Sequence, residues 1–179
     1  MADERDGGGL AAGGEARPIT LYGEQVLHQP CVPVPSDHPD LDKLVADMFA
    51  SMYAADGVGL AANQIGVGLR VFVVDCPDED ERPVLAVVVN PVLHLPEARE
   101  LVEGNEGCLS VPGPQGVLAR PNDATVTGVD LTGAPVEIVG TGLLARCLQH
   151  EYDHLAGTVY VDRLGRRARK RVLAEAGLG

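Results

Sequence analysis

The segment His150-Glu151-Tyr152-Asp153-His154 constrains this chain more than any other feature of its sequence. Its two histidines are four positions apart, so in an α-helix both imidazoles lie on one face, about one turn apart. This HExxH spacing is typical of helices that hold a metal ion and present a carboxylate to the water beside it. The segment therefore predicts a helix, a metal bound by His150 and His154, and a hydrolase that uses Glu151 as general base.

Residues around the motif support a helix. Leu144, Leu148 and Leu155 follow the spacing of one helical stripe. Thr141 can cap the start of this helix, and Gly157 can supply the left-handed residue that ends it.

A catalytic metal needs a third protein ligand and an open position for water. Cys147 is unsuitable because it is seven positions before His154, about 10 Å along the helix axis, so we interpret it as core. The HExxHxxGxxH pattern also fails, because position 160 is Tyr160. Glu175, in a short charged tail, remains a formal candidate.

A cysteine is another candidate for the third metal ligand. Cys108 lies in the turn-like segment Glu106-Gly107-Cys108-Leu109-Ser110, where small neighbours allow close approach of the backbone. The residues alone do not choose Cys108 over Cys31 or Cys76.

The remaining patterns predict an α+β fold. An amphipathic helix is expected over residues 41–52, strands over 70–75 and 84–90, and a β-hairpin from 124–131 to 135–139. Helices and strands do not alternate regularly. We therefore expect mainly antiparallel β-sheets packed around the helix that carries the HExxH motif, with a second amphipathic helix near the N-terminus.

Length and composition limit the domain organisation and the function. We expect residues 1–17, which are rich in glycine and charge, to be a flexible arm, and residues 18–179 to form a single catalytic domain with a short basic C-terminal helix. A net charge of −12 disfavours DNA binding, and the apolar runs are too short to span a membrane. Four cysteines without a close pair, and an acidic N-terminus, indicate the reducing cytoplasm.

The segment Gly57-Val58-Gly59-Leu60-Ala61-Ala62-Asn63-Gln64 matches the pattern GxGxxA. A dinucleotide-binding loop would follow a strand, whereas this segment follows the predicted helix. We therefore expect a loop in which Gly57 ends the helix, Gly59 needs unusual backbone angles and Gln64 lies at the edge.

Together, residues 57–64, 106–110 and 149–155, in this order, resemble the three signature motifs of the peptide deformylase family. The resemblance extends from about Pro18 to the early 170s. It implies metal ligands at Cys108, His150 and His154.

The resemblance also implies an activity, removal of the formyl group from N-formylmethionyl nascent peptides with release of formate. Glu151 would move the proton, and the Gln64 amide and the Leu109 backbone N–H would stabilise the oxyanion. Other implied contacts are the backbones of Val58, Gly59 and Gly107, and a pocket for the first side chain bordered by Leu143, Arg146 and Cys147.

Metal identity and two other functions stay open. The usual affinity order favours zinc, whereas the resemblance implies Fe(II), replaceable by nickel, cobalt or zinc. One alternative is a zinc endopeptidase with Glu175 as ligand. The other is a non-catalytic domain with a structural metal.

Two peripheral segments of the chain lie outside these motifs. We expect residues 112–116 to form a loop at the substrate rim. The basic residues near the C-terminus are either a solvated helix face or a transient contact with the ribosome; they are Arg163, Arg166, Arg167, Arg169, Lys170 and Arg171.

Overall fold

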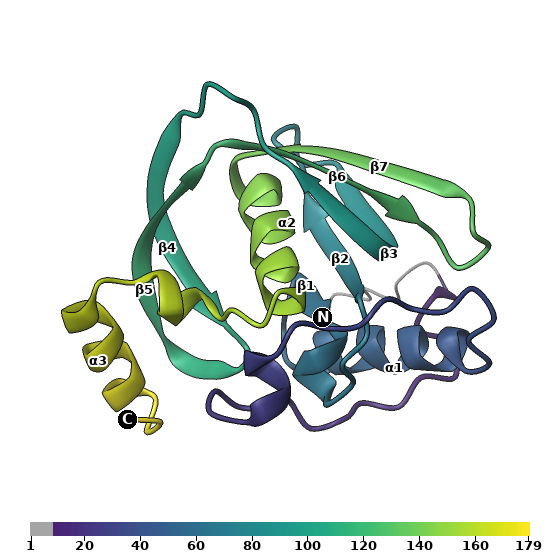
Figure 1. The fold of residues 1–179 in the computed structure, drawn as a ribbon, viewed down its shortest axis with the longest axis horizontal. Coiled ribbons are helices and arrows are strands. Elements are labelled where there is room, and N and C mark those ends of the chain that lie inside the picture. The colour runs from purple at the N-terminus through teal and green to yellow at the C-terminus, as the bar shows by residue number, and fades with distance from the viewer. Residues whose placement is uncertain (1–8) are drawn as a thin grey trace.

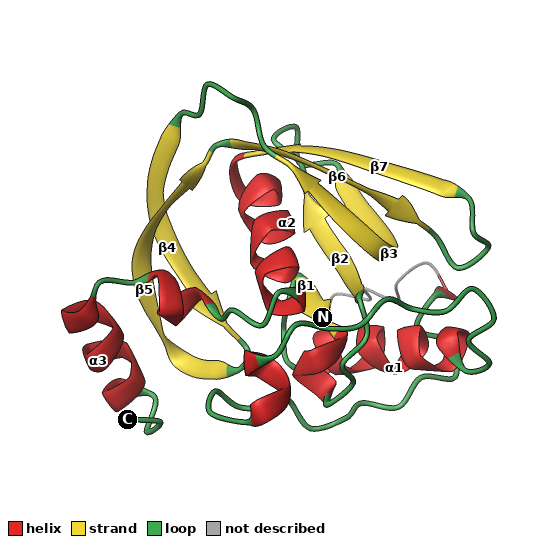
Figure 2. Ribbon diagram, in the orientation of Figure 1, coloured by secondary structure: helices red, strands yellow, loops and turns green. Residues whose placement is uncertain are grey.

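Two antiparallel β-sheets surround helix α2 (Gly142–Leu155) in the computed structural model, which describes residues 9–179 (Figure 1). The larger sheet has the strand order β1-β2-β3-β6-β7, and β4 pairs with β5 in a separate ribbon. The strands are β1 (Gly59–Ala61), β2 (Val71–Pro77), β3 (Pro83–His94), β4 (Leu101–Cys108), β5 (Val111–Pro121), β6 (Asp123–Val129) and β7 (Pro135–Thr141). The expected α+β class with antiparallel sheets is confirmed (Figure 2).

Helix α1 (Leu41–Ala54) confirms the first predicted helix. Its apolar residues recur on one face, so Val45, Met48, Phe49 and Met52 are fully buried and pack against the larger sheet. The third α-helix of the described residues, α3 (Arg166–Glu175), lies at the other end of the molecule (Figure 1).

Helix α2 buries Leu144, Leu148 and Leu155 against the same sheet. Gly157 has a φ of 78° just beyond it, as predicted for a left-handed stop. Thr141 is the N-cap residue of α2, as predicted, but its side chain makes no capping hydrogen bond; its hydroxyl donates to Glu79 instead.

The predicted hairpin is present as β6 and β7. Its turn is stabilised by the Asp130 carboxylate, which accepts hydrogen bonds from the backbone N–H groups of Thr132 and Ala134.

The expected loop over residues 112–116 is wrong, because these residues belong to β5. Among residues 9–179, strand β5 pairs only with β4, so its other edge has no strand partner there and can accommodate prolines that donate no hydrogen bond. The sequence of the β4–β5 ribbon has no strong alternation of apolar and polar residues from which these strands could be predicted.

The N-terminal segment reaches α1. The first eight residues of the expected arm lie outside the described residues. Further along, the N–H of Glu15 donates to Asp47 at 2.8 Å and the N–H of Arg17 to Ser51 at 2.8 Å. No helix within residues 9–179 is long and apolar enough to cross a membrane.

Candidate metal centre

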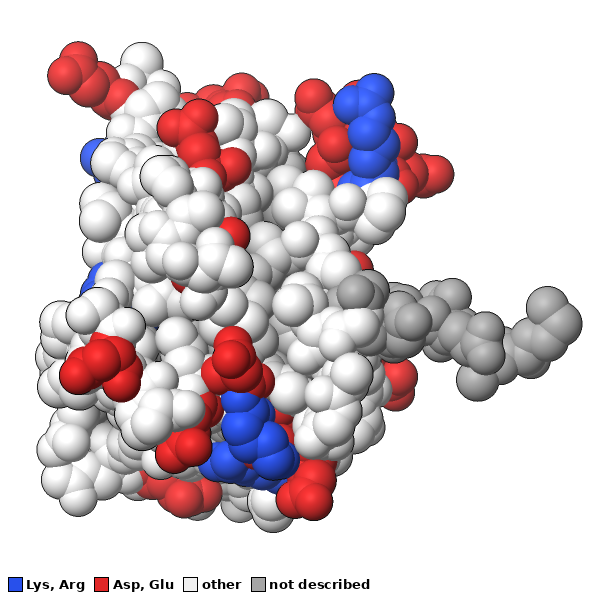
Figure 3. All heavy atoms as spheres, turned by 90° about the vertical axis from the view of Figure 1, so that its right-hand side faces the viewer, with Lys and Arg blue, Asp and Glu red and all other residues white. Residues whose placement is uncertain are grey.

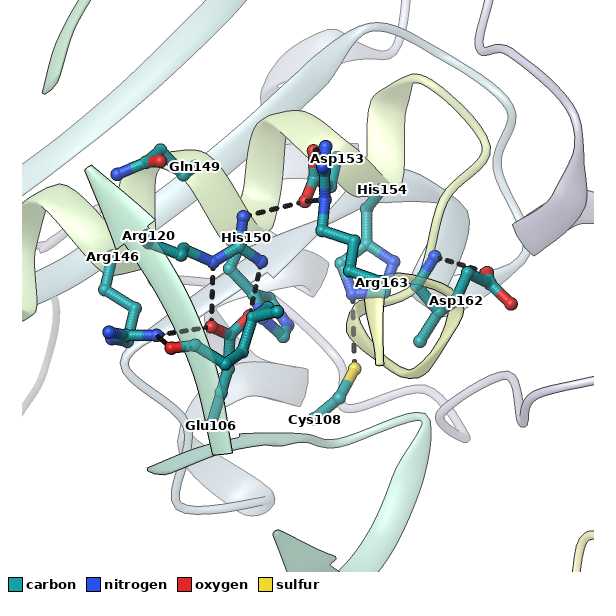
Figure 4. A network of polar contacts seen from close by, with 12 residues as sticks. Glu106, Cys108, Arg120, Arg146, Gln149, His150, Asp153, His154, Asp162 and Arg163 are labelled. Atoms are coloured by element: carbon teal, nitrogen blue, oxygen red, sulfur yellow. Dashed lines mark hydrogen bonds and ion pairs between the residues drawn. The ribbon is translucent and has the colours of Figure 1, made fainter. Parts of the chain in front are cut away.

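Three groups that can ligate a metal converge where α2 meets the end of β4. One ligand atom from each of Cys108, His150 and His154 lies within 4.8 Å of the others. The Cys108 Sγ and the His154 Nε2 are 3.2 Å apart (Figure 4). One thiol and two imidazoles on a rigid helix and strand form a donor set that suits a divalent transition metal with an open position.

The ring of His154 is fully buried. Burial and the nearby His150 lower the pKa of His154 well below its usual value, so its imidazole is neutral, as ligation requires. Asn63 donates a hydrogen bond of 2.6 Å to the His154 backbone carbonyl and fixes the end of the helix against η3 (Ala62–Ile65).

His150 is oriented by Glu106, whose carboxylate accepts a hydrogen bond of 2.7 Å from the Nδ1 of the ring. Burial alone would raise the pKa of Glu106, but hydrogen bonds from Arg120 and His150 hold it well below the usual range. A carboxylate that holds one nitrogen of a histidine leaves the other nitrogen for a metal.

Arg120 joins this carboxylate to the next acidic side chain. It donates to Glu106 through Nε at 2.8 Å and to Asp153 through Nη1 at 2.9 Å (Figure 4). Arg163 donates to Asp153 from the other side at 2.6 Å, and Arg146 donates to Glu106 at 3.0 Å. The alternating charges tie β4 and β5 to α2, and the sequence analysis missed this network because its members are far apart in the chain.

Glu151 is 3% exposed, and its Oε2 is buried without a hydrogen-bond partner among residues 9–179. Burial raises the pKa of Glu151 to about 7. A buried carboxylate oxygen without a partner needs a proton or a small polar ligand such as water. This is the position that a general base beside a metal would take.

Gly59 packs directly against this carboxylate. A Cβ at Gly59 would be 2.6 Å from Glu151 Oε1 and 2.9 Å from Cys147 Sγ. The φ angle of Gly59 is not in the left-handed region, so the prediction that Gly59 needs unusual backbone angles is wrong. Glycine is needed here for close approach.

Gln64 lies on η3, and a hydrogen bond to its side-chain carbonyl fixes its orientation. Its Oε1 accepts a hydrogen bond of 3.0 Å from the N–H of Ala61, so the amide Nε2 points to Cys108 Sγ at 3.5 Å and Ser110 Oγ at 3.3 Å. Leu109 lies in the turn between β4 and β5.

A cavity of about 750 Å³ opens onto these groups. His154 is fully buried and does not line the cavity, and Cys147 is both a member of the apolar core and part of the lining. Ile19 and Leu21 also line the cavity, and the sequence analysis missed them because no motif includes them. The predicted site residues in the lining are Val58, Gly59, Gln64, Gly107, Cys108, Leu109, Leu143, Arg146, Cys147, His150 and Glu151.

Comparisons with known proteins agree with this arrangement. The family model of polypeptide deformylase matches residues 16–170. Peptide deformylase 1 of Streptomyces avermitilis is 54% identical over 164 residues, which cover 90% of this chain and 76% of the relative.

Solved structures show the same fold. The crystal structure of peptide deformylase from Ehrlichia chaffeensis has a TM-score of 0.83 and 34% identity, and the match covers 91% of this chain and 96% of that one. The Met-Ala-Ser bound crystal structure of class I type b peptide deformylase from Acinetobacter baumannii has a TM-score of 0.76 and 35% identity, over 84% and 99% of the two chains. This chain belongs to the peptide deformylase family.

Proposed function

We propose that this chain removes the N-formyl group from the terminal methionine of newly made polypeptides and releases formate. The observation that carries the proposal is the convergence of Cys108, His150 and His154 at a cavity that Cys108, His150 and Glu151 line, with the Glu151 Oε2 buried and without a hydrogen-bond partner among the described residues. Membership of the family supports it, as does the tripeptide bound to the Acinetobacter baumannii relative. Residues 18–179 would act as a single catalytic domain, in the cytoplasm where nascent chains are made.

Cys108, His150 and His154 would hold one divalent metal, with HExxH as the motif on α2. Such a cation, Fe(II) by the family resemblance, with zinc, nickel or cobalt as substitutes, polarises a carbonyl and lowers the pKa of a water molecule. Glu106 would keep His150 in the ligating tautomer through the Nδ1 hydrogen bond.

Glu151 would accept the proton of the attacking water and deliver it to the departing amine. Its burial favours this role, because a carboxylate without a fixed partner is free to take up and release a proton. The C–N bond of the formamide then breaks, and formate and a free amino terminus result.

Gln64 and Leu109 would stabilise the negative charge on the formyl oxygen. The Gln64 side-chain N–H group already points toward Cys108, because the Ala61 N–H fixes the side-chain carbonyl of Gln64. Hydrogen-bond donors placed before the reaction need no reorganisation when the charge develops.

The peptide would lie along backbone groups of Val58, Gly59 and Gly107. Its methionine side chain would enter the part of the cavity bordered by Leu143, Arg146 and Cys147. The Arg146 guanidinium donates to the carbonyls of Val102 and Leu118 as well as to Glu106, so it stiffens this wall.

The alternative of an endopeptidase with Glu175 as ligand loses support. Glu175 accepts a hydrogen bond of 3.1 Å from Arg171 on α3 and does not line the cavity. A non-catalytic structural site would be closed by four protein ligands, and the donor cluster found in the described residues has three.

The test is anaerobic purification with metal analysis and a formate-release assay on formyl-Met peptides. Glu151→Ala should retain the metal and lose activity by about 10²–10⁴-fold. Glu103→Ala, at an exposed position on β4, is the matched control and should retain activity. Equal activity in wild type, Glu151→Ala and Glu103→Ala would refute the mechanism.

A transient contact with the ribosome is a further proposal for the basic C-terminal segment. Arg169 and Arg171 are paired with Asp162 and Glu175, whereas Arg166, Arg167 and Lys170 are exposed on α3. Figure 3 shows the face of the molecule that is turned away from α3. On that face the prominent Lys and Arg side chains lie next to acidic side chains. Charge reversal at Arg166, Arg167 and Lys170 should abolish co-sedimentation with ribosomes, and unaltered co-sedimentation would exclude the contact.

A further inference from the structure

We propose that Ile19 and Leu21 form a subsite for an apolar substrate side chain downstream of the formylated methionine. The subsite rests on the proposed function, because it lies in the same cavity as the metal ligands and Glu151. Neither residue belongs to a sequence motif.

The side chains of this segment alternate. Ile19 and Leu21 line the cavity, whereas Thr20 is 7% exposed and the Tyr22 hydroxyl donates to Asp162 at 2.7 Å. Leu21 lines the cavity and is 37% exposed, so apolar surface of this residue remains available for contact. A substrate side chain that covers it would remove apolar surface from water.

The backbone of the segment is fixed to both halves of the catalytic site. The Thr20 N–H donates to the Gln64 carbonyl at 2.8 Å, and the Tyr22 N–H donates to the Ser110 carbonyl at 2.9 Å. The segment therefore bridges η3 and the β4–β5 turn, which carry Gln64 and Leu109. A wall anchored to the oxyanion donors keeps a constant position relative to the reacting group, as selectivity requires.

Size and geometry make the occupant a later residue of the same peptide. The cavity of about 750 Å³ is within the range of about 300–1,000 Å³ typical of pockets that bury most of a drug-sized ligand. Successive side chains of an extended peptide point in opposite directions. When the methionine side chain points to the α2 wall of Leu143 and Cys147, a later side chain meets a different wall.

The test compares kcat/KM for formyl-Met-Ala-Ser, formyl-Met-Leu-Ser and formyl-Met-Ala-Leu. Wild type should prefer one leucine peptide over the alanine peptide. Ile19→Ala and Leu21→Ala should reduce that preference about four- to fifteenfold, the effect of losing one or two buried methylene contacts, because kcat/KM falls more for the leucine peptide than for formyl-Met-Ala-Ser. Val32→Ala, at a 58% exposed position outside the cavity lining, is the matched control and should change neither value.

Leu21→Asp separates contact from folding. It should favour a lysine over a leucine at the selected position of the peptide, by up to about fivefold, because an exposed ion pair replaces the apolar contact. A misfolded protein cannot gain such a preference.

Failure of the subsite and failure of the proposed function give different results. If wild type shows no leucine preference, or the variants lose activity equally on all three peptides, the subsite is overturned while the proposed function stands. If wild type releases formate from none of the peptides, the proposed function fails and the subsite fails with it.

Discussion

Glu106 on β4 and His150 on α2 are joined by a hydrogen bond of 2.7 Å between a carboxylate oxygen and Nδ1. The same carboxylate is held by two arginines, Arg120 and Arg146. The ring of His150 is therefore fixed by a group that is itself fixed, and this hydrogen bond leaves its Nε2 available to ligate the proposed metal.

Replacement of Glu106 by glutamine should weaken metal binding. Glu106→Gln removes the charge that supports His150 as a ligand, and groups of this kind typically contribute about 10–100-fold to metal affinity. The measurement is competition with a chelator under anaerobic conditions. Glu103→Gln, exposed on the same strand, should leave affinity unchanged; if Glu106→Gln does so as well, the orienting role is excluded.

Much of the fold could be predicted because its elements carry local signals. The apolar stripes of α1 and α2 and the turn around Asp130 each depend on residues close together in the sequence. The β4–β5 ribbon had no such signal. Its residues alternate weakly, and Pro112 and Pro114 resemble loop residues until the free edge of β5 is known.

The candidate site likewise has residues that local sequence patterns predict and residues that they do not. The spacing of His150, Glu151 and His154 within one helix is local and could be predicted from elementary geometry, whereas Cys108 as a partner came only from the family resemblance. Arg120, 14 residues after Glu106, and Ile19, 45 residues before Gln64, are brought to the site by tertiary packing. No periodicity in the sequence encodes those distances.

Gln64 offers a second test of the catalytic geometry. Gln64→Met retains a similar length but lacks the amide donor, so kcat should fall by about 10²–10³ with the metal retained. Steady-state kinetics on a formyl-Met peptide give kcat and KM separately. Gln115→Met, another glutamine of the same cavity, should retain most of kcat. Similar losses in both variants would argue against a specific oxyanion donor.

Gly59 should tolerate no side chain. In Gly59→Ala the new Cβ would be 2.6 Å from Glu151 Oε1, so the carboxylate must move. We expect kcat to fall at least tenfold, with metal content unchanged, because a small displacement of a catalytic group has a large effect on rate.

Gly68→Ala is the control for this prediction, because a Cβ at Gly68 would meet nothing within 4 Å. Full activity in Gly59→Ala would show that Glu151 has room to shift without loss of function.

Asp47 on α1 links the stability of the fold to pH. Asp47 is 1% exposed and accepts hydrogen bonds from Lys43, the Glu15 N–H and Arg17. Burial alone would raise the pKa of Asp47, but these hydrogen bonds outweigh it and lower the pKa to about 2. Asp47→Asn should therefore reduce the free energy of unfolding at pH 7 by about 1–3 kcal/mol.

The sign of the pH dependence follows from the direction of the shift. An unfolded aspartate has a pKa of about 4, so the folded state gains stability from ionised Asp47 above pH 4 and loses it as pH falls toward 2. Urea denaturation at pH 7, 4 and 3 should show wild type and Asp47→Asn converging at low pH. Asp42→Asn, exposed on the same helix, should parallel wild type throughout. A constant difference between wild type and Asp47→Asn would mean that the side chain stabilises α1 by shape and not by charge.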